Sequence, residues 1–492
     1  MLDVFKKRWF ALIIIAFVFL FFANAFKMNF FKDDFFFLQI SHIHDLKGFL
    51  NFFSPMRTYS YKPLASEVFY FFIRNNIFIG RIIVFATYLI GLYFLYRSIF
   101  FLSKNSLLAK LTVFLYAISF VHVFQLYWLA TYQEIVVFTA LTISFYLFLR
   151  KKYLPSIFFY ILALLSKETA ILYVVFLVLI NALINRKKIK NLRKNLVQIY
   201  LPLVSYIVVS AIFYLLFQYS LRFVTSLDNY KMNFNLKLIV NNSLWYFLWA
   251  WGLPNFLPEY MKSIFFKFTA DFWKLFKDKS FLIYLYTYSA YFFIFLSSSI
   301  IYILTNLKKI KEIFLMKIFV LINFFIFLGP ILFFPHRWMI RLTLPLIFIS
   351  LFQAYVFVLF FKNKPVFKIF FIVLIVLYTV TNYFGVKLHE SSSLYLLESR
   401  FVTNADRVFK KYGAQIEKHP VLYFTDFVYN KKIKKKIYYR PWGGSKKLDN
   451  TFHGQYFLDY YFPGKNMKAI YGYTTEKIPK NAYVIHSELF LK

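Results

Sequence analysis

Long apolar stretches recur along most of this 492-residue chain and constrain its fold more than any other feature. The mean hydropathy is +0.58, which is too high for a soluble globular protein. A helix needs roughly 20 apolar residues to cross about 30 Å of hydrocarbon. We therefore predict membrane spans near residues 9–26, 77–101, 108–128, 134–149, 154–167, 169–184, 199–219, 281–304, 316–334, 342–361 and 367–384.

Two of the apolar stretches allow more than one interpretation. The stretch 154–184 is interpreted as two short spans rather than one long helix. The first segment is expected to remain in the protein, because Phe and Ile run through its whole length.

Basic residues lie at alternate connections between the predicted spans. The clusters fall at 6–8, 97–110, 150–152, 186–194, 308–317 and 362–368. By the positive-inside rule this face is cytoplasmic. The odd number of spans then places the N-terminus in the cytoplasm and the C-terminus outside the cell. Frequent Phe, Ile, Lys, Asn and Tyr suggest an AT-rich prokaryotic genome, so we expect a multi-pass protein of the prokaryotic cytoplasmic membrane.

The charge balance is strongly basic, with 59 Lys and Arg against 21 Asp and Glu and a net charge of +38. A nucleic-acid partner is not expected, because most of these cations flank spans, where anionic lipid headgroups account for them. The chain has no cysteine, which excludes disulfides, thiol catalysis and thiolate metal sites.

The chain divides into a membrane domain over residues 1–384 and a polar tail over 385–492. The membrane domain has two large outer loops, at 27–76 and 221–280. Trp and Tyr in the stretch 241–254 favour an interfacial helix lying on the bilayer. The tail is expected to form a small α/β domain, with a helix near 400–416 and strands near 421–425 and 481–486. The lysine run 431–436 is interpreted as a solvated loop, lipid or anionic-glycan contact being the alternative.

An acidic pair, Asp33 and Asp34, follows the first predicted span. Adjacent carboxylates repel each other, so one of them holds its proton longer than a free carboxylate would. A solvated turn at a helix end is one explanation of the pair. The other is a general base at a membrane-embedded active site.

Three further polar clusters are predicted on the same outer face. Ionisable groups at membrane depth are costly, which makes each of them a candidate for function. Together with residues that follow the acidic pair, the candidates are Arg57, Lys62 in Tyr-Lys-Pro-Leu (61–64), Glu67, Glu134 in Tyr-Gln-Glu (132–134), Lys167 and Glu168 in Leu-Leu-Ser-Lys-Glu-Thr-Ala (164–170), and His336, Arg337 and Arg341 in the segment 335–345.

Each cluster also has a structural explanation. Glu134 at the start of a span is stabilised by the helix dipole, and Lys167 and Glu168 can pair with each other. Arg337 and Arg341 can anchor lipid phosphates, and His336 can be an ordinary surface residue. His42, His44 and Asp45 have a spacing that is not specific for a metal, which favours solvated side chains.

The order of these motifs resembles a known family. An acidic pair after the first span, Tyr-Lys-Pro-Leu, an acid opening the fourth span and Leu-Leu-Ser-Lys-Glu-Thr-Ala are similar to the GT-C superfamily of membrane glycosyltransferases. That superfamily includes protein O-mannosyltransferases, oligosaccharyltransferase catalytic subunits and the aminoarabinose lipid A transferase. The stretches 122–170 and 228–258 resemble the O-mannosyltransferases that carry tetratricopeptide repeats. The resemblance covers residues 9–384, and the tail lacks such repeats.

The resemblance implies an all-α polytopic fold of about 11 transmembrane helices with a small extracytoplasmic α/β domain. It further implies transfer of a sugar from a polyprenyl-phosphate donor to a hydroxyl of a glycan, lipid or protein acceptor, with inversion at the anomeric carbon. Asp33 would be the base, with Asp34 as the competing candidate, and Glu134 would orient the acceptor or act as a second acid.

The leaving phosphate would be neutralised by His336, Arg337 and Arg341, with Lys62 as a further contact. Because Arg337 and Arg341 are four residues apart, a helical turn would project both from one side. Arg57, Lys167 and Glu168 are additional candidates. A role for Mg²⁺ or Mn²⁺ is left open, since carboxylate oxygens suit these ions but no metal motif is visible.

Two other functions fit a polytopic, basic and aromatic-rich chain. One is a transporter or flippase of lipid-linked sugars, although such proteins usually place ionisable residues in the middle of spans. The other is a polymerase or ligase of cell-surface glycans, which need not use an Asp base.

Overall fold

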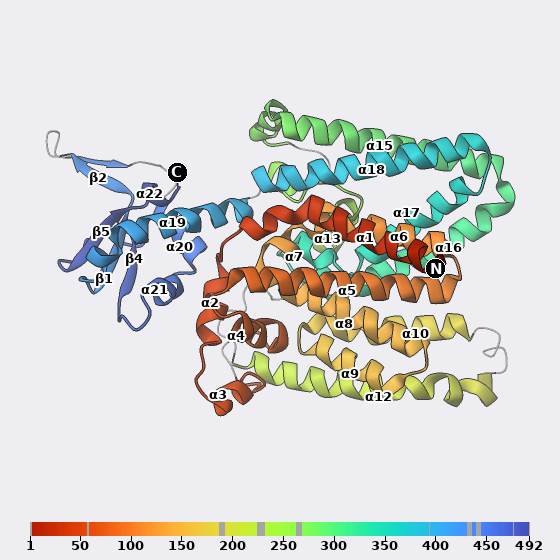
Figure 1. Cartoon of the computed structure of the whole chain (residues 1–492), viewed down its shortest axis with the longest axis horizontal. Helices are drawn as coiled ribbons and strands as arrows, with labels where there is room; N and C mark the ends of the chain where they lie inside the picture. Colours follow the sequence, from red (N-terminus) through yellow and green to blue (C-terminus); the bar gives the residue numbers. More distant parts are fainter. Residues whose placement is uncertain are drawn as a thin grey trace.

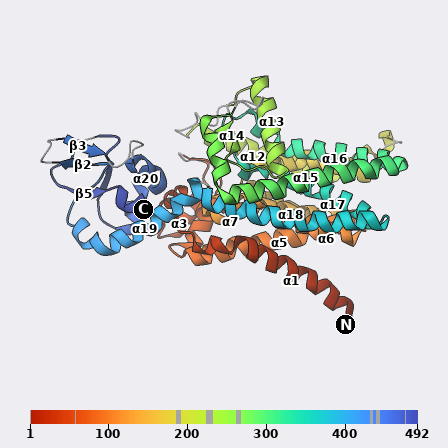
Figure 2. The same cartoon turned by 90° about the horizontal axis from the view of Figure 1, so that it is seen from above.

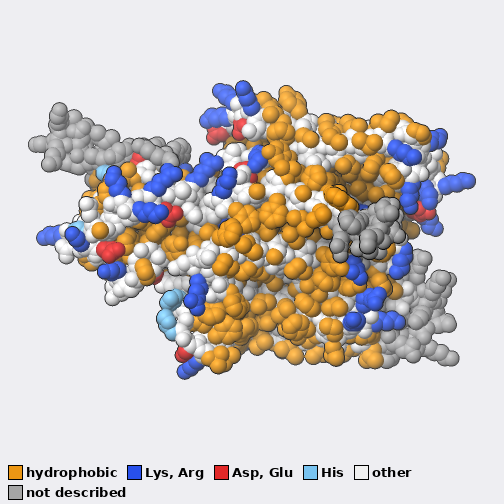
Figure 3. Space-filling view, viewed as in Figure 1, with side chains coloured by type: hydrophobic (Ala, Val, Ile, Leu, Met, Phe, Trp, Pro, Cys, Tyr) orange, Lys and Arg blue, Asp and Glu red, His pale blue; other side chains and the backbone are white. Residues whose placement is uncertain are grey.

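The computed structural model describes residues 2–56, 59–185, 192–223, 232–261, 268–392, 394–430, 435–438, 444–475 and 477–491. A bundle of long helices makes up most of the molecule, and a small α/β domain is attached to one end of it (Figure 1). The N-terminus lies at the opposite end of the bundle. Hydrophobic side chains cover the bundle between two ends that carry most of the Lys and Arg in this view (Figure 3).

Within the described residues, seven helices are long and apolar enough to cross a membrane, some of them extended by a short 3₁₀ turn. They are α1 (Leu2–Phe22), α5 (Ile77–Ser103), α8 (Tyr132–Leu149), α12 (Leu192–Leu221), α15 (Lys279–Thr305), α16 (Ile310–Leu328) and α18 (Pro365–Ser392). An eighth candidate is bent by 48°. It consists of α6 (Ser106–Ala117), η3 (Phe120–His122) and α7 (Val123–Tyr127).

The other three predicted spans are helices that are shorter than this. They are α9 (Tyr153–Leu164), η5 (Glu168–Leu172) continued by α10 (Tyr173–Ile184), and α17 (Leu346–Phe361). The stretch 154–184 is thus two helices, as predicted. An all-α, multi-pass membrane architecture is confirmed, whereas length and composition support seven or eight spans rather than eleven.

Close helix packing holds the centre of the bundle together. Gly91 of α5 lies against α8, and a Cβ atom at this position would come within 2.4 Å of the Phe138 ring. Thr139 of α8 donates a hydrogen bond to the carbonyl of Thr87 (2.8 Å). Small residues allow helix backbones to approach in this way, and hydroxyl hydrogen bonds then add to the packing.

Short elements cap both ends of the bundle. In chain order they are η1 (Ala23–Lys27), α2 (Asp33–Ile40), α3 (Leu46–Asn51), η2 (Leu64–Val68), α4 (Phe69–Ile73), η4 (Leu129–Thr131), α13 (Leu236–Ala250), α14 (Leu257–Tyr260), η7 (Ala270–Lys277), η8 (Leu307–Lys309), η9 (Gly329–Phe333) and η10 (Met339–Leu342).

The aromatic stretch 241–254 lies largely in α13, but its rings do not act as a headgroup-level belt. Trp245, Tyr246 and Trp249 are buried in the protein. Asn242 fixes the helix by donating to the carbonyls of Leu332 (2.8 Å) and Phe334 (2.9 Å). The prediction of a helix is confirmed, while its buried aromatic residues pack against one another and Phe247 packs against Phe324 of α16.

The tail forms the expected small α/β domain. Its helices are α19 (Leu394–Ile416), α20 (Gly444–Phe452), α21 (Tyr456–Tyr461) and α22 (Glu488–Leu491). A three-stranded parallel sheet has the order β4 (Lys468–Tyr471), β1 (Val421–Thr425), β5 (Ala482–His486). In the sheet Val421 pairs with Lys468 on one side and with Ala482 on the other. An antiparallel pair, β2 (Phe427–Asn430) and β3 (Lys435–Tyr438), completes the strands of the described tail.

Two details differ from the sequence-based description of the tail. The expected boundary at residue 384 falls inside α18, which continues to Ser392 because its helical sequence is not interrupted there. Most of the lysine run 431–436 lies outside the described residues.

The α/β domain is docked on the segment that follows the first span. The backbone N–H of Asn29 donates to Ser399 Oγ (2.9 Å), and its side-chain amide donates to Asp406 Oδ2 (3.1 Å). Lys32 forms an ion pair with Glu398 of α19 (2.8 Å). Both views place α19 and α20 beside the end of the bundle that lies away from the N-terminus (Figures 1 and 2). The acidic pair therefore lies at the junction of the two domains.

Candidate functional site

The two acids of the pair have opposite environments. They occupy the first turn of α2, where the helix dipole favours negative charge. Asp34 is completely buried, whereas the Asp33 side chain is 45% exposed. Only Asp33 is therefore open to a molecule that approaches from solvent.

Asp34 is held by three donors. Its Oδ1 accepts from the backbone N–H of Ala130 (2.8 Å) and from the Tyr70 hydroxyl, and its Oδ2 accepts from the N–H of Phe31 (3.0 Å). These bonds tie α2 to α4 and to η4. Asp34 is therefore a structural carboxylate that joins α2, α4 and η4 at the end of the bundle next to the α/β domain.

A buried cation faces this carboxylate. The Arg81 guanidinium donates to the carbonyls of Leu126 (3.2 Å) and Met28 (3.4 Å) and interacts electrostatically with Asp34. Burial raises the pKa of Asp34 to about 7, although the hydrogen bonds from Tyr70 and Phe31 and the charge of Arg81 act in the opposite direction. Sequence reasoning missed Arg81, yet an arginine inside an apolar segment was a visible signal.

The pKa of Asp34 implies a pH-dependent stability. The folded value of about 7 lies above the ordinary value of 3.8, so folding takes up a proton between these limits. Proton uptake by Asp34 therefore contributes to the free energy of unfolding in full below about pH 4. This contribution is lost as the pH rises through about 7. We expect the melting temperature of the wild type to fall across this window relative to that of Asp34→Asn. A pH-independent difference between the two proteins would contradict this prediction.

Asp33 is oriented by the α/β domain. Its Oδ1 lies 3.2 Å from Nδ1 of His453, which follows α20 in a left-handed conformation (φ 51°). The His453 ring also stacks on Phe36 of α2, with 5.7 Å between ring centroids. His453 lies more than 400 residues from Asp33 in the chain, so no local sequence pattern connects them.

The segment 335–341 carries the basic candidates. The backbone N–H of Trp338 donates to the Tyr246 hydroxyl (3.2 Å), and Arg341 donates to the carbonyl of His336 (3.1 Å). Trp338 is extended (φ −148°, ψ 127°), and η10 begins only after it. The expectation that one helical turn carries both Arg337 and Arg341 is therefore wrong, because the contacts of Trp338 straighten the chain between them.

Two properties of this segment bear on anion binding. Arg337 Nη1 is buried and has no hydrogen-bond partner among the described residues. A buried donor of this kind is costly unless a ligand or solvent satisfies it. Burial and the nearby Arg341 charge both lower the pKa of His336, so this residue is a neutral donor rather than a cation at neutral pH.

Trp128 joins the basic segment to the acidic one. Its indole stacks on Phe31 (5.6 Å between centroids) and donates to the Phe31 carbonyl (3.3 Å). It also packs edge-on against Trp338 (5.5 Å). One tryptophan thus contacts both the segment before Asp33 and the segment that carries Arg337.

The clusters around Glu134 and around Lys167 meet beside the basic segment. Lys167 donates to Glu134, and both side chains are buried. Lys62 lies 3.7 Å from Glu168, which also interacts electrostatically with Arg341. The predicted Lys167–Glu168 pairing is thus replaced by pairs with Glu134 and Lys62. Glu67 is buried and accepts from Ser66.

Other candidates contribute less. Arg57 lies outside the described residues. His42 and His44 pack against each other (4.8 Å between ring centroids), while Asp45 caps α3 by accepting from the N–H of Gly48 (2.7 Å). Within the part of the chain that the structure describes, no three His, Asp or Glu side chains gather in a way that could hold a metal ion.

No family model, curated protein or solved structure matches this chain.

Proposed function

We propose that this protein is a membrane glycosyltransferase that moves a sugar from a polyprenyl-phosphate donor to an acceptor hydroxyl. The supporting observation is the contact series through Trp128, which places an exposed carboxylate and a cationic segment at the same end of a helical bundle. The order of sequence motifs, which resembles the GT-C superfamily, favours the same chemistry.

Asp33 is the base in this proposal. Its carboxylate takes the proton of the acceptor hydroxyl while the hydroxyl oxygen forms a bond to the anomeric carbon. The bond from that carbon to the phosphate oxygen breaks, and the polyprenyl phosphate leaves with the electron pair, which inverts the anomeric centre. His453 orients the Asp33 carboxylate. Asp34 cannot serve as this base, because it is fully buried and accepts three hydrogen bonds.

The leaving phosphate is neutralised by Arg337 and Arg341 in this proposal. Arginine keeps its charge at any working pH and can donate two parallel hydrogen bonds to a phosphate. The unpartnered Nη1 of Arg337 is available for such a contact. Lys62 is a further candidate, although it already lies near Glu168. His336 would donate a hydrogen bond without adding charge.

Two of the other candidates have supporting roles. Glu134 is buried and bound to Lys167, so it positions the segment around η5 instead of orienting the acceptor directly. The described residues contain no carboxylate cluster for Mg²⁺ or Mn²⁺, and no step here is routed through a metal.

Replacing Arg337 tests the donor site. We expect Arg337→Lys to weaken donor use although the charge is kept, because a lysine cannot reproduce the paired contacts of a guanidinium. Arg337→Ala should weaken it further. The measurement is the rate of sugar transfer by purified protein against the concentration of a polyprenyl-phosphate sugar.

The matched control for this series is Arg74→Lys. Arg74 is an exposed arginine between α4 and α5, near the same end of the bundle, where it packs over the Phe71 ring. Its replacement should leave the dependence of the transfer rate on donor concentration unchanged. If this dependence is the same for wild type, Arg337→Lys and Arg337→Ala, Arg337 does not contact the donor and serves only to anchor the protein in the lipid.

The proposal places the site on the extracytoplasmic face of a prokaryotic cytoplasmic membrane, in accordance with the distribution of basic residues. Because the chain lacks cysteine, single cysteines report on this orientation. We expect Lys418→Cys in the α/β domain to react with a membrane-impermeant thiol reagent in intact cells. Lys311→Cys, at the start of α16, should react only after permeabilisation. Both positions are exposed. The reverse labelling pattern would show that the α/β domain lies in the cytoplasm and would contradict the proposed topology.

A further inference from the structure

A large pocket lies at the end of the bundle away from the α/β domain. Its volume is about 1080 Å³, and α1, α5, α6 and α8 contribute to its walls. Figure 2 shows the N-terminal part of α1 diverging from α5 and α6 on this side. The pocket thus occupies the space between a splayed first helix and the rest of the bundle, far from the Asp33 site.

One part of the pocket is apolar and continuous with the membrane-facing surface. Ile14 and Ile15 of α1 face Ile90 and Leu92 of α5 across it. Ile15, Ile90 and Phe100 are also exposed on the outside of the molecule, at 37%, 48% and 39%. In a bilayer these residues contact hydrocarbon, so a lipid chain can enter the pocket sideways without crossing a polar barrier.

The other part of the pocket is cationic. Arg97, Lys104, Lys110 and Arg150 line it, and none of its lining residues is acidic. Among the described residues none of these four cations forms an ion pair with a carboxylate. Four uncompensated positive charges over an apolar slot need an anionic counterpart, and the arrangement matches a charged headgroup with hydrocarbon chains below it.

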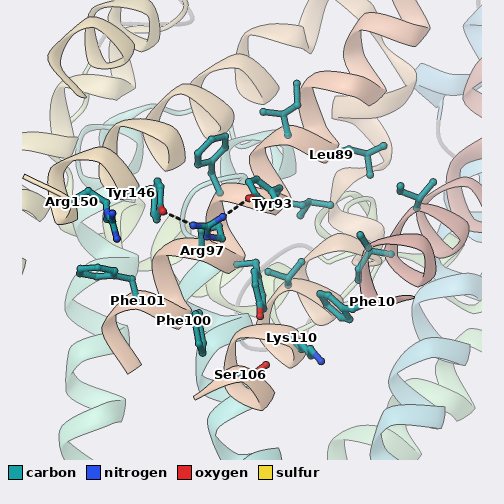
Figure 4. A pocket seen from close by; sticks show the side chains of 18 of the residues that line it. Phe10, Leu89, Tyr93, Arg97, Phe100, Phe101, Ser106, Lys110, Tyr146 and Arg150 are labelled. Atoms are coloured by element: carbon teal, nitrogen blue, oxygen red, sulfur yellow. Dashed lines mark hydrogen bonds between the residues drawn. The ribbon is translucent and has the colours of Figure 1, made fainter. Parts of the chain in front are cut away.

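Arg97 is held in place within the pocket. Its guanidinium donates to the hydroxyl of Tyr146 (2.6 Å) and to that of Tyr93, as Figure 4 shows. The guanidinium carbon also lies 5.0 Å and 5.5 Å from the centres of these two rings. Two phenols fix the orientation of the cation without neutralising it, which leaves its charge available to a ligand.

We propose that this pocket binds an anionic glycerophospholipid of the adjoining leaflet, with its phosphodiester at Arg97 and Lys110 and its acyl chains along α1 and α5. A soluble anion would make no use of the apolar walls. A zwitterionic lipid would bring a second cation to a site that already has four. The pocket volume of about 1080 Å³ lies slightly above the roughly 300–1,000 Å³ of ordinary ligand pockets, which leaves room for hydrocarbon chains beside a headgroup.

Lipid retention by the purified full-length chain tests this inference. Delipidated protein is mixed with phosphatidylglycerol or with phosphatidylcholine of the same acyl chains, and bound lipid is counted by native mass spectrometry. The test variant is the double change Arg97→Gln and Lys110→Gln. The control is Lys308→Gln with Lys311→Gln, which removes two exposed lysines from η8 and the start of α16.

We expect wild type and control to retain phosphatidylglycerol at least about tenfold better than the test variant, because two cations near the headgroup are lost. Neither the wild type nor the control should retain phosphatidylcholine. Ile90→Trp fills the apolar part of the pocket from an exposed position without changing the charge. This change should also reduce the retention of phosphatidylglycerol, and such a result would show that the lipid occupies the apolar part of the pocket.

Three results would overturn the proposal. Equal retention by the test variant would mean that the lipid binds elsewhere on the basic surface. Equal retention of phosphatidylcholine would reduce the pocket to an unselective apolar slot. Displacement of bound phosphatidylglycerol by an equal concentration of polyprenyl phosphate would assign the pocket to that lipid instead. Melting temperatures of all variants check that each one is folded.

Discussion

Asp33→Asn is expected to lower the rate of sugar transfer by about 10²–10⁴-fold, the usual contribution of a positioned general base. The amide keeps the size of the side chain but cannot take up the acceptor proton. The exposed position of Asp33 means that the melting temperature should change little. The measurement is turnover of purified protein with a polyprenyl-phosphate sugar at saturating donor.

The matched control is Asp45→Asn, which changes a carboxylate of the same segment between α1 and α5. Asp45 caps α3, and asparagine is an equally good N-cap residue, so turnover and stability should both stay at the wild-type level. Full turnover by Asp33→Asn would remove the general-base role. Loss of turnover together with a lowered melting temperature would point to a structural effect instead.

The second large effect is expected at the neighbouring residue and concerns stability. Asp34→Ala leaves the donors of Ala130, Phe31 and Tyr70 without an acceptor and removes a carboxyl group that interacts electrostatically with the buried Arg81. Each buried donor left without a partner costs about 1–3 kcal/mol. We expect a correspondingly large fall in the melting temperature of the detergent-solubilised protein.

Asp34→Asn separates this role from catalysis. Its amide oxygen can still accept from Ala130 and Tyr70, so the loss of stability should be clearly smaller than for alanine. Because Asp34 is not open to solvent, transfer by the folded asparagine variant should continue. An alanine variant as stable as the wild type would show that these hydrogen bonds contribute little.

The bundle and the tail were predictable from the sequence for different reasons. Long apolar runs leave a helix as the only way to satisfy backbone groups in lipid, which is why α5 and α15 agree closely with their predicted ranges. The strands β1 and β5 also lie where their short apolar runs predict them. Helices of intermediate length, such as α9 and α17, can be recognised as helices but not as spans.

The candidate site was predictable only in its composition. Its acids and arginines stand out because ionisable residues are rare in an apolar chain, but their partners come from distant segments. Neither the Asp33–His453 contact nor the pairing of Lys167 with Glu134 follows from a local pattern. Trp338 likewise contacts Tyr246 and Trp128, which belong to distant segments of the chain.

The docking of the α/β domain on the segment after α1 has a consequence for biosynthesis. Asn29 and Ser399, which hold the two parts together, are 370 residues apart in the chain. The ribosome makes the first of them near the start of synthesis and the second near its end. The neighbourhood of Asp33 therefore stays incomplete while every intervening helix is inserted. A nascent chain that stalls before α19 would expose Lys32 and Asn29 without their partners in that helix.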